Sequence, residues 1–284
     1  MTSYSIITDS SVQFAQSNFP GSNAIRILHH QIEINGHVYS GAHELRIANF
    51  PRQISPDFQP RIIPFSNETL NESVASILPR VDDLFIIVLS KEFNPLYDQM
   101  SGLSAKLHGR AHIHCIDSQN ISIGLGMIVQ AASEMLSKGV AADDVEQQLR
   151  KLIPHVYMLL CAPNLSYLYL NGSIDYAQSV VGEMIELMSI FTLEDGKLNP
   201  LEKVKNVKGA LDYFIEFFDE FDDVKQLTIL QSAPPTLPEL HLMHQHIEEV
   251  GSSASYSEYP INPFLASLVG PEAFGLGLME NLHR

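Results

Sequence analysis

Polar side chains follow two of the buried-strand patterns in this chain, and their types suit ligand binding. In "ITDSS", Asp9 and Ser10 come directly after the first apolar run, and in "CIDSQNISIGLG" Ser118 comes after a later one. The carboxyl ends of the strands are the usual ligand side of an open α/β sheet. Asp and Ser also cap the helices that follow such strands. Ligand contact and helix capping therefore both stay open for these positions.

The loop after Ser118 resembles the entrance to a phosphate site but lacks the spacing of one. Gly124 and Gly126 lie at the start of an apolar helix pattern. They do not form G-x-G-x-x-G, and no lysine follows them as in a P-loop. Because glycine has no Cβ, it allows another backbone or a ligand to approach closely. We expect that Gly124 allows another element to pack tightly or leaves room for a ligand, and we do not expect a nucleotide site.

The histidines do not form a convincing metal or catalytic set. His112 and His114 would share a strand face, and His241 and His244 a helix face. A metal site needs three or four converging ligands, which these pairs do not supply, so we predict surface histidines. There is also no G-x-S-x-G elbow to support a Ser-His-Asp triad. We expect a protein that is not an enzyme and has no cofactor.

The composition, with 45% hydrophobic and 18% charged residues, is that of a globular protein. The length of 284 residues favours two domains. No apolar run reaches the ~18 residues of a membrane span, and the start lacks a signal peptide, so we expect a cytoplasmic protein without membrane insertion. Cys115 and Cys161 are predicted to be buried free thiols. The net charge of −16 lies mostly after residue 155. It disfavours nucleic acid and fits either solubility or a basic protein partner.

Strand patterns alternate with helix patterns in the first half, which predicts a parallel sheet covered by helices on both faces. The pairs Asn35-Gly36 and Asp195-Gly196 predict two hairpins. The predicted strands are Tyr4–Thr8, Ala24–Ile34, Leu84–Leu89, His112–Ile116, Tyr157–Ala162 and Gln226–Gln231. The predicted helices are Asn67–Leu78, Leu96–Leu107, Ile121–Lys138, Ala142–Ile153, Tyr176–Met188 and Lys205–Phe218.

We place a domain boundary near Pro154. Residues 1–154 are predicted to form an α/β domain with a parallel sheet, and residues 155–284 an α/β domain with strands of mixed direction. No linker of glycine and serine separates them, so the domains should pack closely. The space between two domains is a preferred place for a ligand pocket.

Eight segments, in order and over nearly the whole chain, resemble the DegV family of bacterial fatty-acid-binding proteins. The order and spacing of the segments carry the resemblance, because no single one of them is decisive. They are "IITDSS", "IRILHHQIEINGHVYSGAHEL", "PFSNETL", "IIVLSKEFNPLYDQM", "CIDSQNISIGLGMIVQAASEMLSKG", "NLSYLYLNGSI", "LEDGKLNPLEKVKNVKGAL" and "VGPEAFGLG".

The resemblance implies a fold and a role. The fold has an N-terminal α/β/α domain with a parallel sheet, a C-terminal α/β domain with a mixed sheet, and an acyl chain buried between them. The role is to present a bound long-chain fatty acid to a separate fatty-acid kinase, while the binding protein does no chemistry. The helix start at Gly124 would then lie against the acyl tunnel and would not cradle a nucleotide.

This chain departs from the family at the residues that hold the carboxylate. The family uses a threonine, a serine and a histidine, which align with Ile62, Asn94 and Leu268. Only Asn94 can still donate a hydrogen bond. The family's Gly-Gly-Arg is Asn171-Gly172-Ser173 here, so that arginine is lost as well. A buried carboxylate without paired donors is costly or becomes protonated.

Three arrangements would still allow a ligand. The hydroxyls of Ser66, Ser90, Ser118 or Ser267 could donate from shifted positions, the ligand could be a neutral alcohol, ester or isoprenoid, or its head group could lie in water at the pocket mouth. We therefore predict a lipid-binding protein and keep two rivals. One is an interaction protein with the same fold that has lost carboxylate binding. The other is an enzyme acting on a small phosphorylated or acyl substrate at the edge formed by Asp9 and Ser118.

Overall fold

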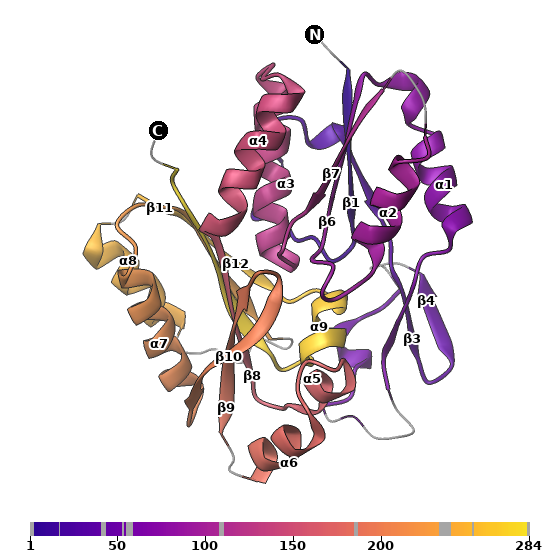
Figure 1. Cartoon of the computed structure of the whole chain (residues 1–284). Coiled ribbons are helices and arrows are strands. Elements are labelled where there is room, and N and C mark those ends of the chain that lie inside the picture. The colour runs from indigo at the N-terminus through magenta and orange to yellow at the C-terminus, as the bar shows by residue number, and fades with distance from the viewer. Residues whose placement is uncertain are drawn as a thin grey trace.

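The computed structural model describes residues 3–16, 18–40, 44–52, 54, 59–107, 111–184, 187–232, 240–251 and 253–282. Figure 1 shows two sheets with their helices, the N-terminal part in indigo and magenta and the C-terminal part in orange and yellow. The predicted fold class, a parallel N-terminal sheet and a mixed C-terminal sheet, is confirmed.

The N-terminal sheet is parallel throughout, with the strand order β2-β1-β6-β7. Its central strand β6 is buried at every position, as the apolar run predicts. Helices α1 and α2 cover one face, and α3 and α4 cover the other (Figure 1). The strands are β1 (Tyr4–Asp9), β2 (Ile25–Leu28), β6 (Asp83–Val88) and β7 (His112–Asp117), and the helices are α1 (Asn67–Ala75), α2 (Leu96–Ser104), α3 (Ser122–Ser137) and α4 (Ala142–Leu152).

A small antiparallel sheet leaves the main sheet, in the order β4-β3-β5. Asn35 and Gly36 connect β3 to β4 with φ values of 54° and 74°, which is the geometry of a type I′ turn. One predicted strand, Ala24–Ile34, is wrong as a single element, because it is divided into β2 and β3. The division falls at His29 and His30, where the chain turns away from the parallel sheet. The strands are β3 (Gln31–Ile34), β4 (His37–Ser40) and β5 (Arg61–Ile63).

The C-terminal sheet has six strands in the order β10-β9-β8-β13-β11-β12. Only β11 and β12 run parallel, so the sheet is mixed. Helices α7 and α8 cover its outer face (Figure 1). The strands are β8 (Val156–Ala162), β9 (Met188–Glu194), β10 (Lys197–Val204), β11 (Val224–Gln231), β12 (Ser255–Pro260) and β13 (Phe274–Glu280). The helices are α5 (Ser166–Leu170), α6 (Tyr176–Met184), α7 (Val207–Asp219), α8 (Leu240–Val250) and α9 (Pro263–Val269).

Short 3₁₀ helices occur at connections, and one contains the predicted domain boundary at Pro154. It leads directly from α4 into β8. No helix in the described segments is long and apolar enough to cross a membrane. The 3₁₀ helices are Ser22–Ala24, Ile47–Asn49, Leu78–Arg80 and Ile153–His155.

Helix α3 joins the two parts, because it contacts strands of both sheets. Nearly all of its side chains are buried, and the two glycines in its first turns explain how it packs so closely. A Cβ at Gly126 would collide with the carbonyl of Gln13, and one at Gly124 with the side chain of Asn120. The structure therefore gives these glycines a packing role at the start of α3.

Candidate ligand pocket

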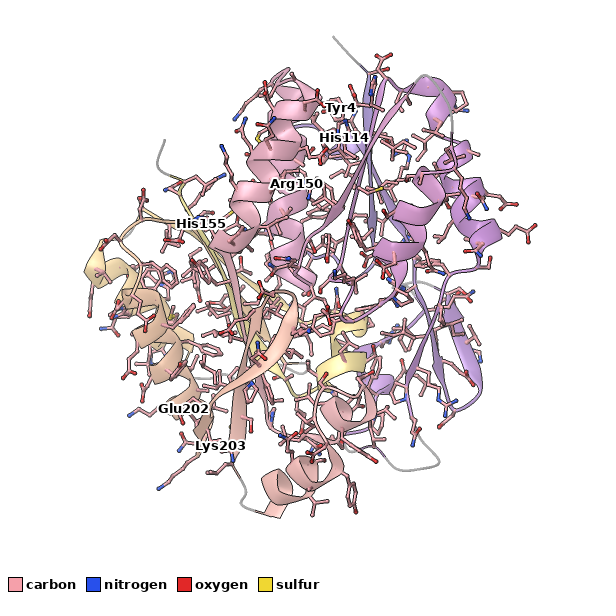
Figure 2. The ribbon with its side chains drawn as sticks, viewed as in Figure 1. Tyr4, His114, Arg150, His155, Glu202 and Lys203 are labelled. Carbon is pink, nitrogen blue, oxygen red and sulfur yellow. The ribbon has the colours of Figure 1, made fainter. Side chains whose placement is uncertain are left out.

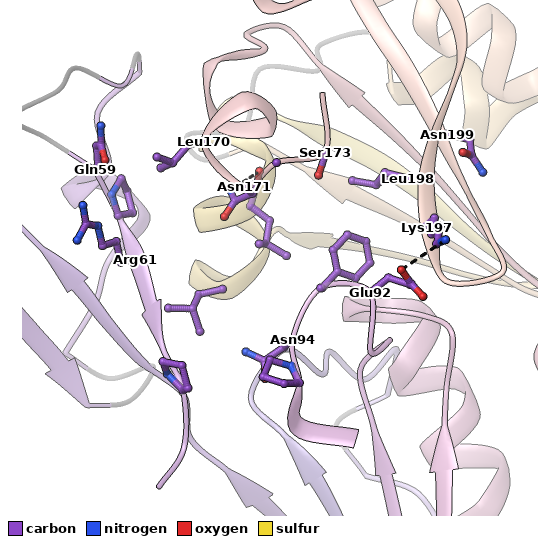
Figure 3. A pocket seen from close by; sticks show the side chains of 17 residues that line it. Gln59, Arg61, Glu92, Asn94, Leu170, Asn171, Ser173, Lys197, Leu198 and Asn199 are labelled. Atoms are coloured by element: carbon purple, nitrogen blue, oxygen red, sulfur yellow. Dashed lines mark hydrogen bonds and ion pairs between the residues drawn. The ribbon is translucent and has the colours of Figure 1, made fainter. Parts of the chain in front are cut away.

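A pocket of about 740 Å³ lies between the small antiparallel sheet, the loop after β6 and the C-terminal part. Figure 3 shows side chains from all three regions facing it. Apolar and polar residues are equally represented in its lining. The apolar ones are Pro60, Ile62, Pro64, Phe93, Pro95, Leu170, Leu198 and Leu268, and the polar ones are Gln59, Arg61, Glu92, Asn94, Asn171, Ser173, Lys197 and Asn199.

The three positions aligned with the family's carboxylate anchors all line this pocket. Ile62 comes from β5, Asn94 from the loop after β6 and Leu268 from α9. The Asn171-Gly172-Ser173 segment, aligned with the family's Gly-Gly-Arg, lines it as well. Segments that are far apart in the sequence therefore meet at one cavity.

Asn94 is the anchor position that retains a polar side chain. It is 6% exposed, and its Oδ1 accepts a hydrogen bond of 3.1 Å from the backbone N–H of Leu96. This bond begins α2 and fixes the orientation of the amide. Asn94 Nδ2 has no hydrogen-bond partner among the described residues, so this amide nitrogen can donate to a ligand.

Asn171 lines the same pocket but has a structural function. Its Nδ2 donates to the carbonyls of Tyr167, Ser267 and Leu268 at 2.9, 3.1 and 3.1 Å. These bonds tie the end of α5 to α9. The amide nitrogen is therefore already used and is not available to a ligand.

Two cations lie at opposite margins of the pocket (Figure 3). Lys197 Nζ lies 3.6 Å from Glu92 Oε2, and both groups are partly exposed. Arg61, on β5, forms no ion pair with any residue that the structure describes. A ligand carboxylate at the mouth of the pocket would therefore meet cations that are already solvated. An exposed ion pair of this kind contributes only roughly 0–1 kcal/mol.

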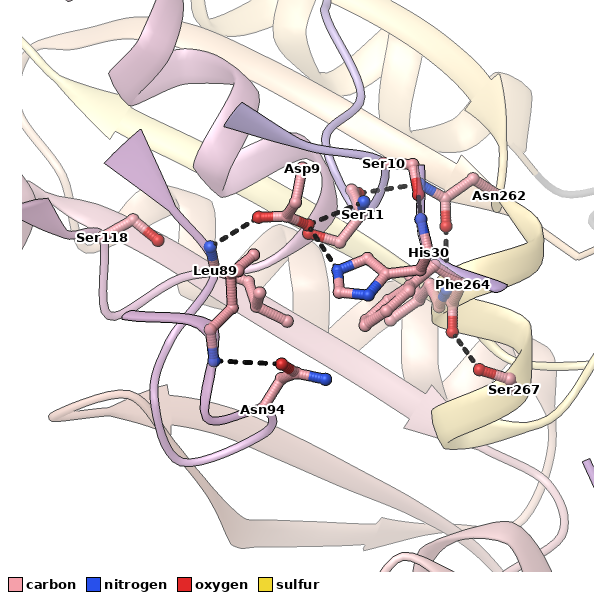
Figure 4. A network of polar contacts seen from close by, with 12 residues as sticks. Asp9, Ser10, Ser11, His30, Leu89, Asn94, Ser118, Asn262, Phe264 and Ser267 are labelled. Atoms are coloured by element: carbon pink, nitrogen blue, oxygen red, sulfur yellow. Dashed lines mark hydrogen bonds and ion pairs between the residues drawn. The ribbon is translucent and has the colours of Figure 1, made fainter. Parts of the chain in front are cut away.

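Asp9 lies outside this pocket and joins strands. It is fully buried, with Oδ1 accepting from the N–H of Ser11 at 2.9 Å and Oδ2 from the N–H of Leu89 at 2.8 Å. His30 Nε2 lies 3.4 Å from Asp9 Oδ1 (Figure 4). Burial by itself would raise the pKa of the Asp9 carboxyl. The interaction with His30 and the two N–H groups outweigh burial and lower this pKa below its ordinary value.

The candidate serines also have their hydroxyls engaged elsewhere. Ser10 Oγ accepts from the N–H of His30, Ser118 Oγ donates to the carbonyl of Asn120, and Ser66 Oγ accepts from the N–H of Thr69 at the start of α1. Ser90 and Ser267 donate to backbone carbonyls as well. None of these five serines lines the large pocket. Their contribution to ligand binding stays a prediction.

The histidine prediction needs one correction, because His114 is buried. It is 6% exposed, stacks on Phe85 with ring planes 12° apart, and its Nδ1 lies 2.7 Å from Glu146 Oε2. Glu146 is shared with Arg150, and Figure 2 shows His114 and Arg150 in the same region of the N-terminal part. Among the residues that the structure places, no three metal-ligating side chains converge.

Cys115 and Cys161 are free thiols, and burial raises the pKa of Cys161 to about 12.

Sequence reasoning missed His30. The alternation Leu28, His30, Ile32 and Ile34 places this histidine on the buried side of the chain, and all four are buried in the structure. This alternation, with a period of two residues, was the signal in the sequence that His30 is buried.

The chain belongs to the DegV family, whose sequence pattern matches residues 3–281. A DegV domain-containing protein of Caldanaerobacter subterraneus is 25% identical over 186 residues, which cover 66% of each chain.

Two solved structures show the same fold. A fatty acid binding DegV family protein from Streptococcus agalactiae matches with a TM-score of 0.86 at 16% identity, covering 99% of this chain and all of the other. The fatty acid kinase B3 protein of Streptococcus pneumoniae, loaded with linoleic acid, matches with a TM-score of 0.83 at 14% identity over 99% of this chain and 100% of the other.

Proposed function

We propose that this protein binds a long-chain fatty acid in the 740 Å³ pocket and presents it to a partner kinase, without catalysing a reaction itself. The observation that carries the proposal is the convergence of Ile62, Asn94 and Leu268 on one cavity. The shared fold brings these aligned positions together, and an open cavity is present where they meet. The similar proteins described as fatty acid binding, and the kinase protein loaded with linoleic acid, support the ligand class and the partner.

The proposed pocket lies between an N-terminal domain of residues 1–154 and a C-terminal domain of residues 155–284. The acyl chain would pack against Ile62, Phe93 and Leu268, where burial contributes roughly 0.8 kcal/mol for each CH₂. The Asn94 amide would donate to the carboxylate. The protein would act in the cytoplasm and need no cofactor beyond this ligand.

The test is a comparison of two asparagine variants in binding of oleic acid. Replacing Asn94 with alanine removes the free amide donor, so we expect the Kd to rise about tenfold, as for one hydrogen bond to a charged group. Asn199→Ala is the matched control, because Asn199 lines the same pocket but its Nδ2 already donates to Glu194. Titration calorimetry measures both. Equal affinities of Asn94→Ala and the unmodified protein would remove Asn94 as the anchor.

A second candidate, binding of a neutral apolar ligand, is favoured by the apolar side chains at two of the three anchor positions. Ile62 and Leu268 leave little to stabilise a charge. Native mass spectrometry of the protein purified from bacteria, followed by organic extraction, separates the two. A fatty acid bound at near one-to-one ratio supports the first proposal and a neutral lipid the second. Empty protein that takes up neither would favour an interaction protein.

A further inference from the structure

A second large cavity, of about 630 Å³, lies between α7 and the hairpin of β9 and β10. Figure 1 shows α7 beside this hairpin, on the outer side of the C-terminal sheet. The cavity shares no lining residue with the pocket proposed for the ligand. We call it the outer groove, and the residues that define it here are Tyr157, Thr192, Glu194, Tyr213, Phe217 and Glu220.

The floor of the outer groove is formed by aromatic and aliphatic side chains. Tyr213 and Phe217 lie one helical turn apart on α7, and the ring centroid of Tyr157 on β8 lies 6.2 Å from that of Phe217. Leu201, on β10, also lines the groove and is 41% exposed. Partly exposed rings and a leucine in one concave surface can cover apolar side chains of a partner.

Carboxylates reach the groove from both of its walls. Glu194 lies on the same face of β9 as Thr192, two residues away, and Glu202 pairs across the hairpin with Ile190 on that face. Ile190 belongs to the hydrophobic cluster that includes α7. Both glutamates therefore lie on the side of the sheet that faces α7, and Glu220 lies at the C-terminal end of this helix.

No cation compensates these carboxylates among the described residues that line the groove. Lys197 on the hairpin lines the other pocket instead and pairs with a glutamate there. Burial and the carboxylates of Glu220, Glu202 and Glu216 together raise the pKa of Tyr213. Nearby negative charge disfavours a phenolate, so the ring in the floor of the groove experiences a negative potential.

A partner for this groove must bring positive charge and apolar surface together. Arginine does both, because its guanidinium forms paired hydrogen bonds with carboxylates and stacks on aromatic rings. Nucleic acids and anionic membranes carry the wrong charge. In the described part of the chain, no three side chains converge to hold a metal ion. Charge complementarity therefore favours a basic protein segment.

We propose that the outer groove docks a basic, amphipathic segment of a protein partner. Arginine side chains of that segment pair with Glu194 and Glu220, and an apolar side chain packs against Leu201 and Phe217. This inference does not rest on the proposed function, because the two cavities share no lining residue. It assigns a use to the negative charge that is concentrated after residue 155.

The test starts with a phage-displayed library of random 12-residue peptides, selected on the full-length protein. We expect enrichment of peptides that combine arginine with leucine or aromatic residues. The most enriched peptide is then synthesised, labelled with a fluorophore, and its Kd is measured by fluorescence anisotropy for the unmodified protein and for two matched pairs of variants.

The first pair of variants removes charge. Glu194→Gln combined with Glu220→Gln should raise the Kd about fivefold, as for the loss of two exposed ion pairs. Glu248→Gln combined with Glu249→Gln is the control, because it removes the same charge from exposed positions on α8 outside the groove. The control should change the Kd less than about twofold.

The second pair of variants removes apolar surface. Leu201→Ser should raise the Kd about fivefold, because the leucine no longer covers an apolar side chain of the peptide. Leu282→Ser is the control, since Leu282 is 40% exposed, as Leu201 is, but does not line the groove. Thermal unfolding checks that every variant is folded.

Three outcomes would overturn the inference. One is a library selection that enriches no basic peptides. Another is an equal effect of the groove variants and their controls, which would assign binding to the overall negative charge of the protein. The third is competition by spermidine at the same concentration as the unlabelled peptide, which would assign the groove to a small organic cation.

Discussion

At the residue scale, the pocket differs from the one that the family resemblance implies chiefly in its hydrogen-bond donors for a carboxylate. Ile62 and Leu268, which the resemblance aligns with hydrogen-bond donors of the family, are apolar, and among the three aligned positions Asn94 carries the polar side chain. Arg61 and Lys197 supply positive charge only at the exposed margins, where solvent weakens it. We therefore expect the proposed acyl ligand to be held more by burial of its chain than by its head group.

Restoring a donor on β5 should strengthen carboxylate binding. Ile62→Thr places a hydroxyl on the strand face that lines the pocket, and we expect the Kd for oleic acid to fall about fivefold, as for one added hydrogen bond. Ile63→Thr is the matched control, because successive side chains of a strand point to opposite faces and Ile63 does not line the pocket. Titration calorimetry on both variants checks the prediction. An equal effect of the two substitutions would show that the strand is perturbed and that no anchor has been restored.

At the element scale, the hairpin of β9 and β10 fastens the C-terminal sheet onto the N-terminal part beside the pocket. Gly196 in its turn has φ of 81°, and its carbonyl accepts a hydrogen bond of 2.8 Å from Ser90 Oγ. The next residue, Lys197, pairs with Glu92 across the same junction. Because Lys197 and Glu92 both line the pocket, this contact fixes one of its walls.

A side chain at Gly196 should break this contact. In Gly196→Ala the new Cβ would collide with Ser90 Oγ and the residue would keep a left-handed φ, so we expect a loss of about 2–4 kcal/mol in the free energy of unfolding. Gly36→Ala is the control, because Gly36 has a similar φ of 74° in the other hairpin but open space around it, and should cost only about 1 kcal/mol. Denaturant unfolding measures both. Equal losses would mean that the junction at Ser90 contributes nothing.

At the scale of the whole molecule, one hydrophobic cluster extends through both predicted domains, and a second lies within the C-terminal part. A single cluster runs from Ile6 and Phe85 in the parallel sheet to Met158 and Leu265 in the C-terminal part. Between them lies α3, whose Ile123 and Met127 pack towards the C-terminal sheet at Gly277. The core is continuous across the boundary at Pro154.

This shared core predicts that the first 154 residues do not form a stable protein by themselves. A fragment of residues 1–154 would expose the face of α3 that the C-terminal sheet covers, and an apolar patch of that kind favours aggregation. We expect the fragment to unfold without a cooperative transition, whereas the full chain unfolds in one. Circular dichroism during thermal unfolding distinguishes them. A fragment with a sharp transition of its own would show that the boundary separates independent domains.

Local patterns in the sequence determined most of the elements, because they depend on neighbouring residues. The strict apolar run of β6 and the Asn35-Gly36 and Asp195-Gly196 turns all occur as expected. Local pattern could not separate β2 from β3, since at the division the backbone N–H of His30 donates to Ser10, in the turn after β1. His114 was misjudged for the same reason, because its burial depends on Glu146 of a distant helix.

The sequence by itself determined the family and the order of the elements, because both depend on residue types and their spacing. Only the tertiary structure decided that Ile62, Asn94 and Leu268 meet at one pocket, since contacts between distant segments depend on how the sheets pack. It also decided that the buried carboxylate of Asp9 faces the ring of His30. Burial and pairing of polar groups are properties of packing, and no local pattern records them.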